Sequence, residues 1–219
     1  MFGTVPFGRH HATALLRFRS LDEAAEFVPA LVAAGATAVE LMDAPSLRAS
    51  QDVEGAPAWL REVEDDAALL VEFRTSAEAD LPVFEQAASH VLSRAGAAVQ
   101  GEFTRDPTVA GRHWRVRKGL LAALGGSRST GTILLGEDVC VPPPDVAEAA
   151  RDLRAVLEQF GFNGSIAGHA AAGKGRTRHR QEHGPVRLAR VGPTSRRPDA
   201  PHQDRVRSAW HPQPRRPAQ

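Results

Sequence analysis

The chain has 219 residues with 27 Lys and Arg, 26 Asp and Glu and a formal net charge of +1 at pH 7, a length that fits one domain or little more and allows a packed core. Its one cysteine, Cys140, excludes an internal disulfide bond and favours a reducing compartment. The N-terminus lacks a secretory signal and no apolar stretch approaches the roughly 18 residues of a membrane-spanning helix, so we expect a cytoplasmic protein that at most lies against the inner face of the cell membrane.

The first part of the chain has the pattern of a β–α–β unit. The apolar run at residues 14–18 predicts a strand. Ser20 is expected to cap the following helix, because Glu23 three residues later completes a capping box. Apolar residues then recur at helical spacing as far as Gly35, and residues 37–42 predict a second strand.

The same pattern returns further along the chain. Residues 70–79 match residues 15–24 at five of ten positions and predict a second strand and helix cap. A helix to about Arg94 and a strand at residues 97–103 complete the second unit. Two such units predict an α+β fold, the ferredoxin-like duplicated βαβ sandwich. Its two helices would cover one face of the sheet and leave the other to a partner or to the rest of the chain.

An additional helix–strand–helix–strand segment follows the sandwich. The pattern predicts these elements, in order, at residues 106–124, 132–141, 146–160 and 165–167. The last strand leads into Gly168 and His169.

Basic residues share one side of the helix at residues 106–124. Helical spacing places Trp114, Arg117, Lys118 and Leu121 together. An apolar ring beside a guanidinium suits the capture of a carboxylate, because the planar fork donates two parallel hydrogen bonds. The alternative is a solvated basic face.

Two acidic residues interrupt the apolar strand at residues 132–141. Glu137 and Asp138 cannot both face solvent if this strand is buried on both sides, and a buried carboxylate needs a cation or a metal. Arg117, Lys118 and Arg128 are the candidate cations, in a structural salt bridge or in an active site. Cys140, without a metal-binding partner, is expected in the core.

His169 stands among small residues, which allow a bulky ligand to approach closely. A histidine at a strand end can be a base, a metal ligand or a structural residue. Residues 168–174 also match the first seven positions of a phosphate-binding P-loop. That hypothesis is disfavoured, because Gly175 stands where a Mg²⁺-binding hydroxyl is needed.

These motifs, taken together, resemble the C-terminal domain of FAD-linked oxidases, in particular the D-lactate dehydrogenase and glycolate oxidase group whose members can carry an iron–sulfur domain. The resemblance spans residues 4–173. Its motifs are Ala38–Asp43, Leu69–Phe73, Trp114-x-x-Arg117-Lys118-Gly119, Gly131-Thr132, Glu137-Asp138-Val139-x-Val141-Pro142 and Gly168-His169-x-x-x-Gly173.

The resemblance implies a function for several of these residues. Arg117, with Lys118 and Arg128 nearby, would bind the carboxylate of a small 2-hydroxy acid such as D-lactate or glycolate. His169 would act as the base or hold a divalent metal, and Glu137, Gly168 and His169 would lie towards FAD. The family's Gly-Asn-Leu-His continuation is replaced by Gly173-Lys174-Gly175-Arg176, so a second metal-binding histidine is missing. The expected FAD-binding domain is also missing, which predicts a fragment that is inactive alone and needs an FAD-binding domain or subunit.

Residues 174–219 differ from the rest of the chain. They hold twelve basic and three acidic residues, seven prolines and four histidines, a net charge of +9 against −8 for residues 1–173. This composition predicts a disordered basic tail, and the abrupt loss of the family pattern suggests a shifted reading frame or a truncated gene. Nucleic-acid binding by the tail is a weaker hypothesis. The main alternative to the enzyme is a non-catalytic ferredoxin-like module that binds a ligand or partner across its open sheet.

Overall fold

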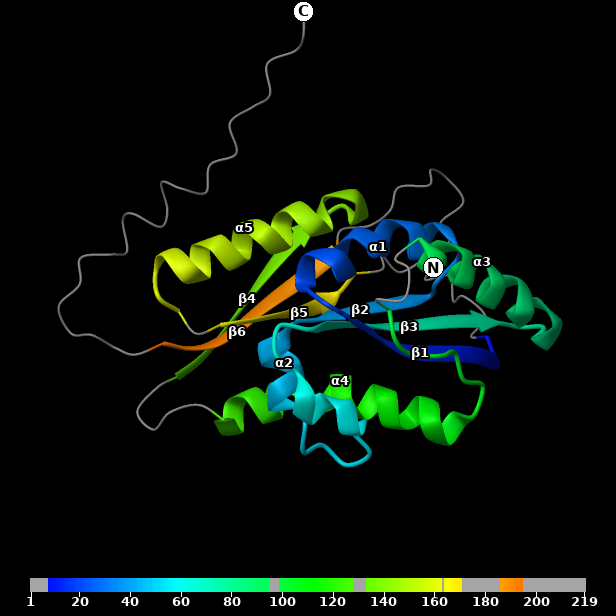
Figure 1. Ribbon diagram of the computed structural model, residues 1–219, viewed down its shortest axis with the longest axis horizontal. Helices are drawn as coiled ribbons and strands as arrows, with labels where there is room; N and C mark the ends of the chain where they lie inside the picture. The colour runs from blue at the N-terminus through cyan, green and yellow to red at the C-terminus, as the bar shows by residue number, and fades with distance from the viewer. Residues whose placement is uncertain (1–7, 95–98, 128–132, 163, 171–185, 195–219) are drawn as a thin grey trace, which may run out of the picture.

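Two layers of helices enclose a six-stranded antiparallel sheet in the computed structural model of the chain (Figure 1). The structure describes residues 8–94, 99–127, 133–162, 164–170 and 186–194. The strands are β1 (His10–Phe18), β2 (Ala38–Met42), β3 (Ala67–Thr75), β4 (Ile133–Val141), β5 (Ser165–His169) and β6 (Val186–Thr194). The helices are α1 (Leu21–Ala33), α2 (Ala44–Ala49), α3 (Leu81–Ser93), α4 (Pro107–Ser127) and α5 (Val146–Gln159), with short 3₁₀ turns at Ala58–Glu62, Glu78–Asp80 and Pro143–Asp145.

The strand order β1-β3-β2-β5-β6-β4 contains the predicted ferredoxin-like arrangement. β3 lies between β1 and β2 and is antiparallel to both, as expected for a split βαβ unit. Of the predicted strand at residues 97–103, residues 97 and 98 lie outside the described part of the chain, and the described segment that follows makes isolated bridges, which join Thr13 to Thr104 and Arg17 to Gln100 along the outer edge of β1. Gly101 lies between them with φ +124°, and a Cβ there would be 2.5 Å from the Leu15 carbonyl oxygen. This close backbone approach requires glycine and interrupts a regular strand.

Helices α1, α3 and α5 cover one face of the sheet (Figure 1). The side chain of Ser20 accepts a hydrogen bond from the backbone N–H of Glu23, which confirms the predicted cap of α1. The core on this side contains Phe18 and Phe73, both fully buried, and Phe73 stacks on Phe84 of α3 at 5.5 Å between ring centroids. The apolar side chains of the two predicted helices, α1 and α3, therefore face the sheet.

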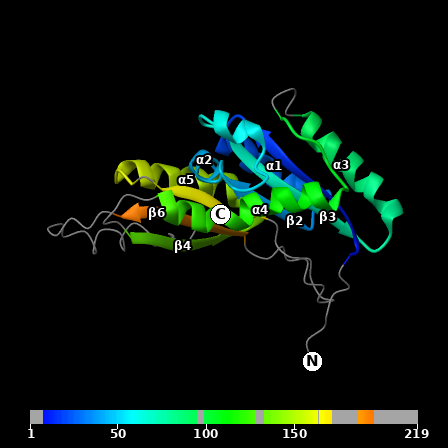
Figure 2. The same ribbon diagram turned by 90° about the horizontal axis from the view of Figure 1, so that it is seen from below.

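The opposite face is covered by α2 and α4, and α4 runs across the sheet in the view from below (Figure 2). This second core contains Met42, Leu47, Leu60, Leu70, Val116 and Leu120. The sequence predicted no helix at Ala44–Ala49, and of the two occupants expected for this face, a partner or the rest of the chain, the structure shows the second. Binding of a partner across an open sheet is therefore disfavoured, because the chain's own helices occupy that surface. No helix of the described residues is long and apolar enough to cross a membrane.

Two predictions about the last strands need correction. Val186–Thr194 form β6 between β5 and β4, although this segment was predicted to be disordered. Pairing with two neighbours provides backbone hydrogen bonds that composition does not reveal. Cys140 is exposed and not in the core. β4 is an edge strand, and Val139 and Val141 on either side of Cys140 pack against the core, so period-two alternation turns Cys140 outwards.

Candidate functional site

The site is built around Glu40, a buried carboxylate in the apolar strand β2. Arg117 of α4 donates from Nε to Glu40 Oε2 at 2.8 Å. His169 Nδ1 lies 2.7 Å from the other carboxylate oxygen, Oε1. We call Glu40, Arg117 and His169 the Glu40 cluster. The two residues expected to bind and oxidise a 2-hydroxy acid therefore share one carboxylate.

Sheet register and helix packing bring these three residues together. Glu40 and His169 are direct partners in the antiparallel β2–β5 pair, so their side chains lie on the same face. Arg117 reaches that face from α4. The side chains of Arg117 and His169 are 27% and 39% exposed. Each is thus bound to Glu40 and partly exposed.

A second buried carboxylate, Glu72 of β3, fixes α4 independently. Glu72 Oε2 accepts hydrogen bonds from Trp114 Nε1 at 2.8 Å and from Thr13 Oγ1 at 3.1 Å, while Oε1 pairs with Arg74. Trp114 precedes Arg117 by three residues, so the two side chains bind neighbouring strands from one side of the helix.

The predicted grouping on α4 holds only in part. Trp114 and Arg117 turn towards the sheet, whereas Lys118 and Leu121 are exposed. The Lys118 ammonium lies 5.7 Å from the centre of the Trp114 ring, a cation–π distance. The buried side of α4 is centred on Val116 and Leu120. Lys118 and Leu121 therefore lie on the outer side of the helix.

His113, on the inward side of α4, was not singled out in the sequence. Its Nδ1 atom is buried without a hydrogen-bond partner among the described residues. Burial lowers the pKa of His113 and so favours the neutral ring. The helix that carries Arg117 therefore packs around an uncharged imidazole.

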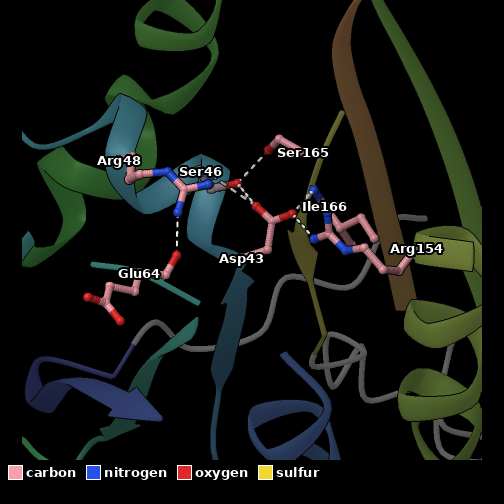
Figure 3. A network of polar contacts seen from close by, with 7 residues as sticks. All are labelled: Asp43, Ser46, Arg48, Glu64, Arg154, Ser165 and Ile166. Carbon is pink, nitrogen blue, oxygen red and sulfur yellow. Dashed lines mark hydrogen bonds and ion pairs between the residues drawn. The ribbon is translucent and has the colours of Figure 1, made fainter. Parts of the chain in front are cut away.

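Asp43, at the end of β2, joins the site to the rest of the fold (Figure 3). Its carboxylate accepts hydrogen bonds from the backbone N–H and hydroxyl of Ser46, from the backbone N–H of Ile166 at 2.6 Å and from Arg154. The Ser46 hydroxyl also contacts that of Ser165 at 2.6 Å. Asp43 thereby caps α2 and ties β5 and α5 to β2, which fixes the strand that carries His169.

A cavity of about 460 Å³ lies beside this network. Arg48, Arg151 and Arg154 line it together with Asp22, Asp65 and Glu158. Neither Arg117 nor His169 is in its lining, so this cavity is separate from the Glu40 cluster.

The other predicted site residues are distributed as follows. Gly168 pairs with Leu41 of β2 and Leu188 of β6, next to His169. Glu137 lies in β4, in register with Arg190 of β6 and through it with Ile166, so its backbone is two strands, roughly 10 Å, from β5. The side chain of Glu137 and the whole of Arg128 lie outside the described part of the chain. Within that part, no three His, Cys, Asp or Glu side chains are grouped as metal ligands, so the structure adds no ligand to His169.

Comparison with known proteins shows which family the chain matches. Residues 8–175 match the family model of "FAD linked oxidases, C-terminal domain". The chain is 26% identical over 170 residues to D-2-hydroxyglutarate dehydrogenase of Escherichia coli (strain K12), an alignment that covers 72% of the chain and 17% of that protein.

Solved structures share the fold. An alkyldihydroxyacetonephosphate synthase superimposes with a TM-score of 0.56 and 9% identity, over 94% of this chain and 38% of that one. The 4-ethylphenol oxidase from Gulosibacter chungangensis gives a TM-score of 0.52 and 9% identity, over 86% and 40%. The chain thus spans less than half the length of each of these proteins.

Proposed function

The chain belongs to the FAD-linked oxidase family, whose C-terminal domain is formed by its residues 8–175, and on that premise we propose that it supplies the substrate side of an active site that oxidises a 2-hydroxy acid such as D-lactate or glycolate. The Glu40 cluster carries this proposal, because it holds a guanidinium and an imidazole on the same carboxylate while both side chains remain partly exposed.

Arg117 has the chemistry of a carboxylate clamp. Its Nε–H is donated to Glu40, and the guanidinium has further N–H donors that can bind a carboxylate. Its planar fork matches the geometry of a carboxylate. Lys118 adds a second positive charge at the exposed side of α4. Arg128 is proposed to contribute in the same way.

His169 is proposed to remove the proton of the substrate hydroxyl. As the O–H bond breaks, its proton passes to the imidazole and the carbon–oxygen double bond of a 2-oxo acid forms. FAD, held by its own domain, would supply the acceptor for the hydride that leaves the α-carbon. Gly168 and Glu137 are proposed to face that cofactor. A divalent metal at His169 would need ligands from outside the described residues.

The proposal requires partners. An FAD-binding domain or subunit is needed to hold the cofactor, and an iron–sulfur domain or another electron acceptor is needed to remove the electrons. The reaction geometry then depends on the rigid placement of the α-carbon by Arg117.

Binding of a carboxylate to the isolated chain tests the clamp. We expect D-lactate to shift backbone amide NMR signals around Arg117 and His169, whereas propane-1,2-diol, which lacks the carboxylate, does not. Arg117→Ala should weaken D-lactate binding at least about tenfold, because a hydrogen bond to a charged group contributes about 1.5–3 kcal/mol. Arg115→Ala, an exposed position on the same helix, is the control. Unchanged affinity in the Arg117 variant would contradict the proposed clamp.

A further inference from the structure

We infer that Glu40 is a positioning residue. It fixes His169 in one tautomer and fixes the orientation of the Arg117 guanidinium. This inference rests on the function proposed above for Arg117 and His169, and it adds a third residue to which that proposal gives no role.

The tautomer of His169 follows from the acceptors around it. The Glu40 side chain is only 9% exposed, and both of its oxygens are engaged, one by each partner. An ionised carboxylate can only accept hydrogen bonds, so His169 Nδ1 carries the hydrogen in the 2.7 Å contact. The lone pair of the neutral ring is then on Nε2, on the side away from Glu40.

This arrangement is the one that a general base requires. A general base is effective when a third group sets its tautomer and orientation, since the lone pair of the ring then already points towards the substrate. The His169 side chain remains 39% exposed, so part of the ring is accessible to a ligand.

The same carboxylate orients Arg117. Glu40 accepts the Nε–H of the guanidinium, and because the group is planar this hydrogen bond fixes the orientation of the whole fork relative to β2. Arg117 and His169 are therefore both positioned by one side chain of the sheet, Glu40. A lysine at position 117 would lose this function, because one ammonium has no second, planar edge.

A purely structural role in docking α4 makes a different prediction. Glu72 also binds α4, through Trp114, but its carboxylate is bonded to Trp114, Thr13 and Arg74 and not to His169. Loosening of α4 by Glu72→Leu should therefore leave the His169 tautomer unchanged, whereas Glu40→Leu removes the oxygen that accepts from His169 Nδ1. The pair Glu40→Leu and Glu72→Leu is thus a matched test.

The experiment is ¹⁵N NMR of the histidine rings in the 219-residue chain, in which His169→Gln identifies the His169 signals. We expect the neutral ring of His169 in the unmodified chain to be the Nδ1–H tautomer. Glu40→Leu should shift it towards Nε2–H, and Glu72→Leu should not. If Glu40→Leu does not fold, the unmodified chain still decides: a predominant Nε2–H tautomer overturns the inference.

A kinetic measurement separates this inference from the proposed function. With an FAD-binding domain added, Glu40→Leu should lower the limiting rate of flavin reduction about 10–100-fold, the usual effect of losing an orienting partner. Full activity of His169→Gln would refute the proposed function and leave the tautomer result standing. Loss of activity in His169→Gln together with unchanged activity in Glu40→Leu would refute only the role of Glu40.

Discussion

Asp43→Ala is expected to lower the free energy of unfolding by about 3–5 kcal/mol, the range for breaking a buried ion pair. The Asp43 side chain is 1% exposed, and its removal leaves four donors without their acceptor: the Ser46 N–H and hydroxyl, the Ile166 N–H and the Arg154 guanidinium. The cost is large because the donors are on three different elements, so no single shift of the chain provides a new acceptor for all of them.

Urea denaturation followed by tryptophan fluorescence measures this effect. The control is Asp52→Ala, the same substitution at a side chain that is 79% exposed and pairs with Arg61 on the surface, where a loss below about 1 kcal/mol is expected. Equal losses in the two variants would show that the Asp43 network does not hold β5 and α5 to β2.

His169→Gln is expected to lower the limiting rate of flavin reduction by D-lactate about 10²–10⁴-fold, the usual contribution of a positioned general base. The measurement is anaerobic mixing of D-lactate with the chain assembled with an FAD-binding domain. D-Lactate affinity should change little, because Arg117 still binds the carboxylate.

His90→Gln is the control for His169, since His90 is exposed on α3, in the other helix layer. A rate in His169→Gln within a factor of about two of the unmodified chain would exclude His169 as the base, because such a change corresponds to less than 1 kcal/mol in activation free energy.

The repeated strand and helix pattern predicted most of the fold because it has clear periodicity and caps. The elements that were missed have weaker local signals. α2 has only six residues and depends on the buried Asp43 for its N-cap. The strand predicted at residues 97–103 is irregular in its described part because Gly101 has a positive φ where it approaches the Leu15 carbonyl. β6 owes its conformation to pairing with β4 and β5, and such pairing partners are invisible in a basic, proline-rich segment.

The sequence predicted two of the three residues of the Glu40 cluster. Arg117 and His169 were identified by residue type and by family motif, but the carboxylate that joins them was not, although an acid inside the apolar run Ala38–Met42 is itself a signal of a buried ion pair. The same signal was present for Glu72 in β3. Lys118 was placed beside Arg117 by spacing alone, and only the packing of α4 shows that it is exposed.

The central claim is that Arg117 binds the carboxylate of the compound that His169 deprotonates. It is tested most directly by the rates at which D-lactate and D-lactamide reduce the flavin of the assembled protein, with arginine or alanine at position 117. The account predicts that the unmodified protein strongly prefers D-lactate over its uncharged amide and that Arg117→Ala abolishes this preference. The same preference for D-lactate in both proteins would mean that the carboxylate is recognised elsewhere, and the claim would be wrong.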